Sequence, residues 1–215
     1  MKLTKEDKKI IFQAVQRNEA FTSAEIAWCI TGRSSSYTDA ALIWGIVLVA
    51  FGIVLQLVME LSGSWDGDAT LSLVESVVLF AVGLLVAKIP SCRRLVIDKN
   101  RMRRQVIERA QASFYRGGVQ LTKGHNGVLV FVSVFERLII IIADKAIDDV
   151  GVLKEFIKVV NSENPDKKSW GNKNTVIQKC INHIDALGVI CGSKLPRQVG
   201  DVNELSDDGL NEKEV

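Results

Sequence analysis

Residues 40–59 read AALIWGIVLVAFGIVLQLVM and contain no charged side chain. As an α-helix, a run of this length extends about 30 Å, which matches the hydrocarbon thickness of a bilayer. A second apolar run, TLSLVESVVLFAVGLLVAKI, occupies residues 70–89 and has Glu75 as its only acidic side chain. We therefore predict transmembrane helices at about residues 40–60 and 70–89, joined as a hairpin that occupies residues 38–90.

The composition of the whole chain agrees with this prediction. Hydrophobic residues make up 47% of the 215 residues, and they are concentrated in the two runs. Such a content excludes a disordered chain and a collagen-like chain. The two runs also exclude an ordinary soluble enzyme, because their length and purity are those that a bilayer requires.

The charges are distributed unevenly and indicate a topology. The formal net charge is only +2, but residues 88–118 hold nine basic and two acidic side chains, while residues 201–215 hold six acids and one lysine. The loop between the apolar runs has no lysine or arginine. The positive-inside rule then predicts a multi-pass protein of the cytoplasmic (inner) membrane with both termini in the cytoplasm. Basic residues 93–109 are expected to bind anionic headgroups, and we expect no nucleic-acid partner.

Two polar side chains interrupt the apolar runs. In an antiparallel hairpin with a short loop, Gln56 and Glu75 stand at about the same depth, so the amide of Gln56 can satisfy the carboxyl of Glu75. The simplest interpretation is that Glu75 snorkels toward the outer interface. An ion-conducting or proton-relay role is the alternative, although transport normally needs more than one such group.

The remaining sequence predicts a small α/β domain. Residues 3–20 have the apolar spacing of a helix with Thr4 as its N-cap, and TSAEIAWCIT alternates as a strand does. After the hairpin come a helix, two short β-branched runs that predict a strand hairpin, and two further helices; these occupy residues 100–118, 127–135, 138–143, 148–160 and 174–190. Because a strand needs a partner, we predict that the strand around Ile26 pairs with residues 128–134.

This order predicts a small mixed sheet covered by helices, an α/β sandwich that is interrupted in sequence by the membrane hairpin. Residues 1–37 supply the first helix and strand, and residues 91–192 supply the remainder of the soluble domain. Residues 193–215 are predicted to be an acidic, disordered tail.

Three acids are candidates for a cation site. Asp144, Asp148 and Asp149 cluster where the last apolar strand meets a helix, and oxygen ligands suit Ca²⁺ or Mg²⁺. The alternative interpretation is that Asp148 and Asp149 cap the helix and compensate its dipole. No cofactor is expected otherwise.

Other catalytic constellations are not recognisable in the sequence. The four cysteines are scattered without a Cys-x-x-Cys pair, which predicts reduced thiols rather than a metal site or a disulfide framework. His125 and His183 have no serine or cysteine partner at a familiar spacing. Glu136 and Arg137 are interpreted as a tight turn between two strands.

Two segments resemble a known family. TSAEIAWCIT (residues 22–31) with the following SSSY, and RAQASFYRGGVQLTKGHNGVLVFVSVFERLIIIIADKAI (residues 109–147), resemble the TPM-domain family. The resemblance covers most of residues 5–160 and is closest to a membrane branch with a transmembrane hairpin inserted after the first strand. It implies an α/β/α sandwich. Some members of that family are described as acid phosphatases or bind divalent metal, and others assist the assembly or upkeep of membrane complexes.

These observations lead to two functional hypotheses. The first is a non-catalytic protein with a two-helix anchor and a cytoplasmic TPM-like domain, which binds an unidentified protein partner or forms a homo-oligomer. The second is a metal-dependent phosphatase centred on Asp144, Asp148 and Asp149.

Overall fold

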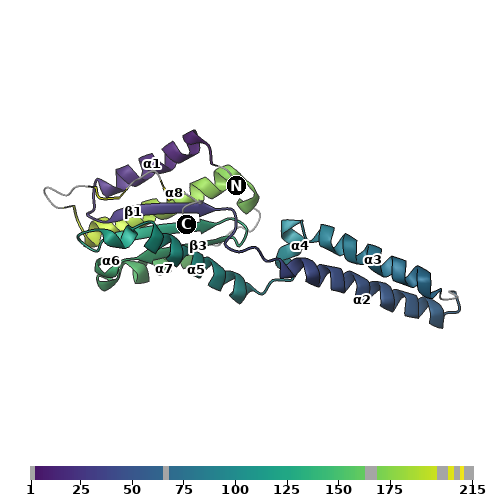
Figure 1. Cartoon of the computed structure of the whole chain (residues 1–215). Coiled ribbons are helices and arrows are strands. Elements are labelled where there is room, and N and C mark those ends of the chain that lie inside the picture. Colours follow the sequence, from purple (N-terminus) through teal and green to yellow (C-terminus); the bar gives the residue numbers. More distant parts are fainter. Residues whose placement is uncertain (1–2, 65–67, 163–168, 198–202, 206–208, 211–215) are drawn as a thin grey trace. The chain divides into compact units, whose positions relative to one another are not determined.

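The computed structural model describes residues 3–64, 68–162, 169–197, 203–205 and 209–210 (Figure 1). The elements that these residues form are, in chain order, α1 (Lys5–Glu19), β1 (Glu25–Thr31), α2 (Asp39–Leu61), α3 (Ala69–Val86), α4 (Pro90–Leu95), α5 (Lys99–Arg116), the 3-10 turn η1 (Val119–Leu121), β2 (Gly127–Ser133), β3 (Leu138–Ala143), α6 (Lys145–Asp149), α7 (Val152–Ser162), the 3-10 turn η2 (Ser169–Gly171) and α8 (Lys173–Lys194).

The chain divides into two compact units. One, the α/β unit, combines Met1–Ser34 with Arg103–Val215, and the other, the hairpin unit, is Ser35–Met102. The α/β unit is therefore assembled from both sides of the hairpin in the sequence. Two apolar helices, α2 and α3, make up most of the hairpin unit.

The sheet has three strands in the order β1-β2-β3. β1 pairs with β2 in parallel, with Ile26 opposite Val128, and this confirms the predicted partner of the first strand. β2 and β3 pair antiparallel as the predicted strand hairpin. The observed fold is thus a mixed α/β fold with a small sheet.

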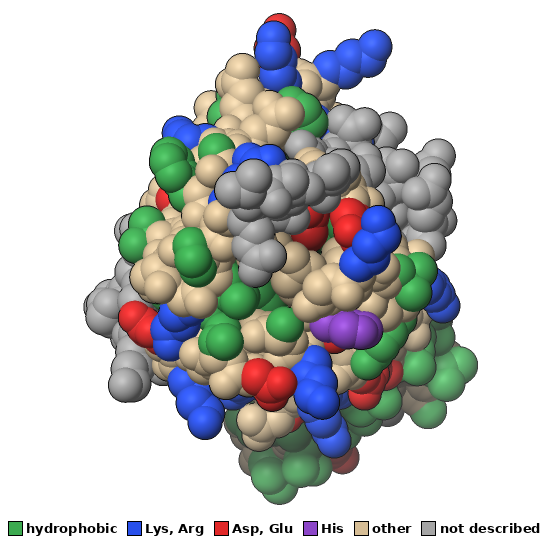
Figure 2. All heavy atoms as spheres, turned by 90° about the vertical axis from the view of Figure 1, so that its left-hand side faces the viewer, with side chains coloured by type: hydrophobic (Ala, Val, Ile, Leu, Met, Phe, Trp, Pro, Cys, Tyr) green, Lys and Arg blue, Asp and Glu red, His purple; other side chains and the backbone are tan. Residues whose placement is uncertain are grey.

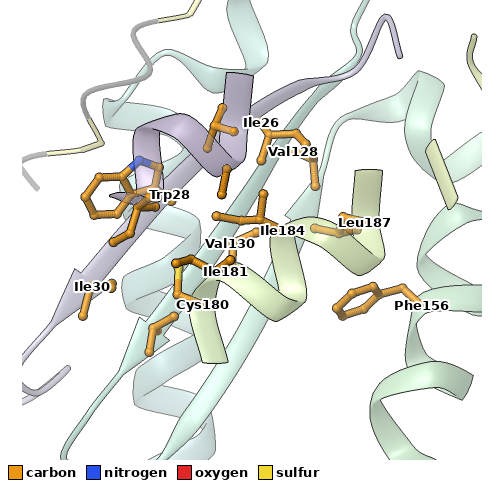
Figure 3. Close-up of a cluster of buried hydrophobic side chains, with 14 of the residues drawn as sticks. Ile26, Trp28, Ile30, Val128, Val130, Phe156, Cys180, Ile181, Ile184 and Leu187 are labelled. Carbon is orange, nitrogen blue, oxygen red and sulfur yellow. The ribbon is translucent and has the colours of Figure 1, made fainter. Parts of the chain in front are cut away.

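Side chains alternate between the two faces of the sheet, and each face has its own core. On one face, Ile26, Trp28 and Ile30 pack with side chains from α1, α7 and α8. Figure 3 shows part of this cluster, with Ile184 of α8 next to Val130 of β2, and with Leu187 of α8 and Phe156 of α7 to the right of the strands. On the other face, Ala27 and Cys29 join residues of α5 in a smaller cluster. Burying each large apolar side chain contributes about 1.5–3 kcal/mol, so both cores hold the sheet together.

The first turn of α1 is capped by the residue that the sequence predicted. Thr4 is the N-cap and accepts a hydrogen bond from the backbone N–H of Asp7 at 3.2 Å, as predicted. Asp7 returns the interaction by accepting from the backbone N–H of Thr4 at 2.7 Å. This reciprocal pair satisfies two backbone donors that a helix start would otherwise leave free.

Two helical boundaries differ from the prediction. The segment expected as one helix over residues 148–160 is split into α6 and α7 at Gly151, whose φ of 72° is left-handed and ends α6. Pro90 is not only a stop after the second apolar run. It occupies the first turn of the short helix α4, a position where proline removes no helical hydrogen bond.

Part of the segment predicted to be a free acidic tail is attached to the α/β unit. α8 continues to Lys194, and Pro196 forms a bridge with Thr22. The N–H of Leu210 donates to the carbonyl of Trp28 in β1 at 2.9 Å. Leu205 and Leu210 pack against the α5-side core, and this apolar contact explains why the acidic segment is not free there. Residues 198–202, 206–208 and 211–215 lie outside the described residues.

Candidate functional site

The first candidate surface is the outside of the α2–α3 hairpin. Both helices are long and apolar enough to cross a membrane, and only 11% and 6% of their most apolar stretches are buried within the structure. A core helix of a soluble protein would be mostly buried. The exposed large side chains include Leu42, Ile46, Phe51, Ile53, Val54, Leu57 and Val58 in α2 and Leu71, Leu73, Val74, Val77, Val78 and Leu85 in α3.

Glycines bring the two helices into close contact. A Cβ atom on Gly83 of α3 would lie 2.5 Å from the Cα of Gly45 in α2 and 2.6 Å from the carbonyl oxygen of Trp44. A Cβ atom on Gly45 would lie 2.5 Å from the ring of Phe80. Small residues at such a crossing allow the backbones to touch, which is how helices associate where the hydrophobic effect does not drive them together.

The structure brings Gln56 and Glu75 together between these helices. The Nε2 of Gln56 donates to Oε2 of Glu75 at 2.5 Å, and both side chains are half-buried. Next to them, Gly52 leaves room beside the other carboxyl oxygen: its added Cβ would lie 3.6 Å from Oε1. The pair is thus a polar contact within the hairpin, with the amide supplying a donor to the carboxyl.

Polar contacts also join the start of α2 to the residues that follow α3 within the hairpin unit. Arg101 forms a bidentate ion pair with Asp39, one of its bonds being 3.1 Å, and its guanidinium lies 5.9 Å from the centre of the Tyr37 ring. The indole N–H of Trp44 donates to the carbonyl of Cys92 at 2.9 Å. Arg101 therefore has a structural role among basic residues 93–109.

Several members of the basic segment are accessible. Arg103 and Arg104 in α5 and Lys99 at its start are exposed, and Arg93, Arg94 and Arg109 are half-buried. Arg93 donates from Nε to the carbonyl of Ala87 at 2.9 Å. The exposed cations can bind anions such as lipid phosphates.

The predicted cation ligands do different things in the structure. Asp144 is the N-cap of α6: its Oδ1 accepts from the N–H of Lys145 at 2.7 Å. Its Oδ2 lies 3.1 Å from Nδ1 of His125, an exposed histidine on the preceding loop. Both oxygens of Asp144 thus have protein partners.

Asp148 and Asp149 are both exposed and belong to α6, whose N-cap is Asp144. The interpretation of these two acids as N-caps is therefore wrong, whereas Asp148 does lie in the first turn of α6, where an acid compensates the helix dipole. Among the described residues, no group of three or more His, Cys, Asp or Glu side chains is placed to hold a metal ion.

A polar cluster that the sequence did not indicate lies at the carboxyl ends of the two parallel strands. Glu136, in the turn after β2, accepts from the backbone N–H of Ser34 at 2.9 Å and from the hydroxyl of Ser133. The hydroxyl of Ser34 donates to that of Ser133 at 2.9 Å. We call Ser34, Ser133 and Glu136 the serine–glutamate clasp.

The position of the clasp is one where α/β proteins often bind ligands. The chemistry is that of a hydroxyl relay ending on a carboxylate. However, Ser133 is fully buried and Glu136 is 7% exposed, so the central hydroxyl is closed off from solvent in this conformation. The clasp joins the end of β1 to the β2–β3 turn, and Ser34 directly precedes the hairpin unit in the chain.

Three of the four cysteine thiols, Cys29, Cys180 and Cys191, are also buried, whereas Cys92 is half-buried. Burial raises the pKa of the Cys180 thiol to about 12, with a further contribution from nearby Cys29, and burial raises the pKa of Cys191 to about 12 as well. These thiols stay protonated and are poor nucleophiles. His183 is buried against Phe156, and its Nδ1 lies 2.7 Å from the carbonyl of Lys179.

The comparisons with known proteins give a fold neighbour. No family model matches the chain, and no curated protein matches it. The solved NMR structure of the BA42 protein from the psychrophilic bacterium Bizionia argentinensis is similar, with a TM-score of 0.55 and 20% sequence identity, and the match covers 97% of this chain and 94% of that one. At this identity the likeness concerns the fold alone: the chain shares a mixed α/β architecture with BA42.

Proposed function

We propose that this chain is a membrane-anchored, non-catalytic protein whose TPM-like α/β domain binds protein partners or a second copy of itself at the cytoplasmic face of the membrane. The observation that carries the proposal is the apolar exterior of α2 and α3. Their large side chains are exposed along both helices, and only lipid or another apolar surface offers them favourable surroundings. A role in the assembly or upkeep of membrane complexes is consistent with such an anchor.

The proposed orientation has its support in the charges. Exposed Lys99, Arg103 and Arg104 follow the second apolar helix, whereas the described residues between α2 and α3 include Asp68 and no basic side chain. Basic residues are retained on the cytoplasmic side and attract anionic headgroups there. The soluble domain and both termini are then cytoplasmic.

The non-catalytic part of the proposal is supported by what the candidate reactive groups already do. Asp144 caps a helix, Ser133 is buried in the clasp, and Cys180 is a protonated core thiol. Figure 2 shows one face of the molecule on which side chains of both charge signs are interspersed with separate hydrophobic ones. Such a mixed surface is typical of a solvated domain face.

Cysteine labelling tests the anchor and its orientation. On a Cys92→Ser background, Ser64→Cys in the loop between the helices and Ser36→Cys before α2 are both exposed positions. In right-side-out vesicles, a membrane-impermeant maleimide should label Ser64→Cys at once and Ser36→Cys only after permeabilisation. The reverse pattern would contradict the orientation, and release of the chain by a carbonate wash would contradict the anchor.

A phosphatase assay separates the proposal from its rival. Full-length protein in vesicles is given a phosphate monoester with Mg²⁺ or Ca²⁺, and Asp144→Asn is compared with Asp148→Asn. We expect no metal-dependent turnover. Metal-dependent turnover that Asp144→Asn or Asp148→Asn abolishes would replace the binding proposal with the enzymatic one.

A further inference from the structure

The free edge of the sheet at β3 is unusual in its composition. β3 is LIIIIA, an end strand without a charge, a proline or a glycine. Soluble proteins normally protect such edges with charged residues, prolines, bulges or a covering segment, because an open apolar edge pairs with another strand. β3 has neither charged residues nor prolines, and it has no bulge, because its register with β2 is continuous from Leu138 to Ala143.

The hydrogen-bonding groups at this edge can be identified from the ladder. The N–H of Asp144 donates to the carbonyl of Gly127 at 2.8 Å. Asp144 and Gly127 are therefore a hydrogen-bonded pair of the antiparallel ladder. Alternation then points the N–H and C=O groups of Ile139, Ile141 and Ala143 away from β2. In the part of the chain that the structure describes, these groups have no protein partner.

The opposite edge of the sheet is partly covered. On β1, the N–H of Ile26 donates to Glu19 at 2.7 Å, and the carbonyl of Trp28 accepts from Leu210 in the C-terminal segment. The chain's own residues therefore satisfy two of the outward-pointing groups of β1, whereas the described residues provide no such partner for those of β3.

The side chains of β3 define what kind of strand can be added. Ile139, Ile141 and Ala143 pack against the core shared with α1 and α8, while Leu138, Ile140 and Ile142 pack against the α5-side core. An added strand must be apolar on both faces to continue both cores, whereas an ordinary edge strand has one polar face. β3 of a second copy meets this requirement. We propose that two copies of this chain associate by antiparallel pairing of their β3 strands.

The edge groups fix the register of the pairing. In an antiparallel ladder, outward-pointing residues face one another as hydrogen-bonded pairs. A two-fold axis at Ile141 places Ile141 opposite its own copy and Ile139 opposite Ala143 of the second copy. The residues between them form apolar pairs of Ile140 with Ile142. This register uses all three outward-pointing residues and joins two three-stranded sheets into one.

This inference rests on the proposed function, because a shared membrane confines the copies and raises their effective concentration. A single strand junction is smaller than a standard interface of about 800 Å² per partner, so confinement is an essential part of the association. Failure of the pairing would leave the anchoring and orientation results unchanged, so the two proposals fail separately.

Disulfide trapping tests the register. Ile141→Cys and Ile139→Cys are made on the Cys92→Ser background, in which the three remaining cysteines are buried, and each full-length variant is oxidised in vesicles. Across the proposed axis, Cα atoms of a hydrogen-bonded pair are about 5.5 Å apart, within disulfide range, whereas the two copies of Ile139 are about four residues out of register, roughly 13 Å apart.

We expect Ile141→Cys to form a cross-linked dimer and Ile139→Cys to remain monomeric. Equal cross-linking of both variants, or none of either, overturns the proposal. Hydrogen exchange of the unmodified chain provides a second readout that needs no substitution. The peptide covering residues 138–143 should exchange more slowly in vesicles with many copies than in vesicles with a single copy, and rates independent of copy number also overturn it.

Discussion

The crossing of α2 and α3 at Gly83 leads to a quantitative prediction. In the structure, a Cβ atom on Gly83 would meet backbone atoms: the Cα of Gly45 at 2.5 Å, its N at 2.6 Å and the carbonyl oxygen of Trp44 at 2.6 Å. Backbone atoms cannot rotate away as a side chain can. Non-bonded carbons are most favourable at about 3.5–4.0 Å, so Gly83→Ala requires the helices to separate by about 1 Å at this point.

The separation has an expected free-energy cost. Overpacking a close contact costs about 1–3 kcal/mol, which corresponds to roughly a 5- to 150-fold shift toward the opened hairpin. The higher helix propensity of alanine does not offset this cost, because the helices stay helical when the hairpin opens in detergent. Gly83→Ala should therefore open at a lower SDS fraction than the unmodified hairpin.

The assay follows energy transfer between two dyes during an SDS titration in mixed micelles. The dyes are attached to Leu42→Cys and Lys88→Cys, two exposed positions of the hairpin unit, on the Cys92→Ser background. Replacing Cys92 keeps the Trp44 hydrogen bond, since that bond is made to the backbone carbonyl. Loss of transfer reports separation of the helices.

Two variants serve as controls. Ala81→Leu changes an exposed position of α3 and should change the free energy of hairpin opening by no more than about 0.5 kcal/mol, so the SDS midpoint should hardly move. Gly52→Ala meets the end of the flexible Leu79 side chain, at 2.3 Å, and should have a smaller effect than Gly83→Ala. An unchanged midpoint for Gly83→Ala, or an equal shift for Ala81→Leu, would refute the backbone contact.

Three further predictions concern the α/β unit. Hydrogen bonds with Lys173 and with the backbone N–H of Thr4 lower the pKa of Asp7 from 3.8 to about 2. The stabilisation of the fold by ionised Asp7 is therefore complete above the unfolded pKa and is lost as the pH falls toward 2. The melting-temperature gap between the unmodified chain and Asp7→Asn should therefore close over that interval. Iodoacetamide at about pH 8 should modify half-buried Cys92 but not Cys180 until the chain is unfolded, as read by mass spectrometry. Glu136→Ala removes the acceptor of two donors in the clasp and should destabilise the fold by about 1–3 kcal/mol in thermal melts. Glu136→Gln keeps an acceptor oxygen and should recover part of this stability. Equal destabilisation by the two substitutions would contradict a stabilising role for these hydrogen bonds.

The features that the sequence predicted well are those that a local pattern encodes. The apolar runs predicted α2 and α3, because a long run of uncharged apolar residues can be recognised as a helix without knowing which distant residues contact it. The pairing of Ile26 with Val128 was predictable because a single strand before the hairpin required a partner after it. Gln56 and Glu75 are 19 residues apart in the chain, and their contact was predictable because they lie equally far from the loop of an antiparallel hairpin.

The features that it did not predict depend on long-range contacts. The clasp joins Ser34 to Glu136 across 102 residues, and only a hydroxyl inside an apolar strand, Ser133, hinted at it. The attachment of the acidic tail depends on Leu205 and Leu210, two apolar residues that a charge count overlooks. The break between α6 and α7 depends on a single left-handed glycine, Gly151.

The central claim is that one α/β domain is split in sequence by its own membrane anchor. A protease site inserted between Ser35 and Ser36 tests it directly, because cleavage leaves α1 and β1 joined to the rest only through non-covalent contacts, chiefly the sheet and its cores. Membranes containing the full-length chain are cut and pelleted, and the fragment ending at Ser35 is followed by an N-terminal tag. We expect this fragment to pellet with the membranes; its release into the supernatant under native conditions would contradict the claim that α1 and β1 fold with the residues after the hairpin.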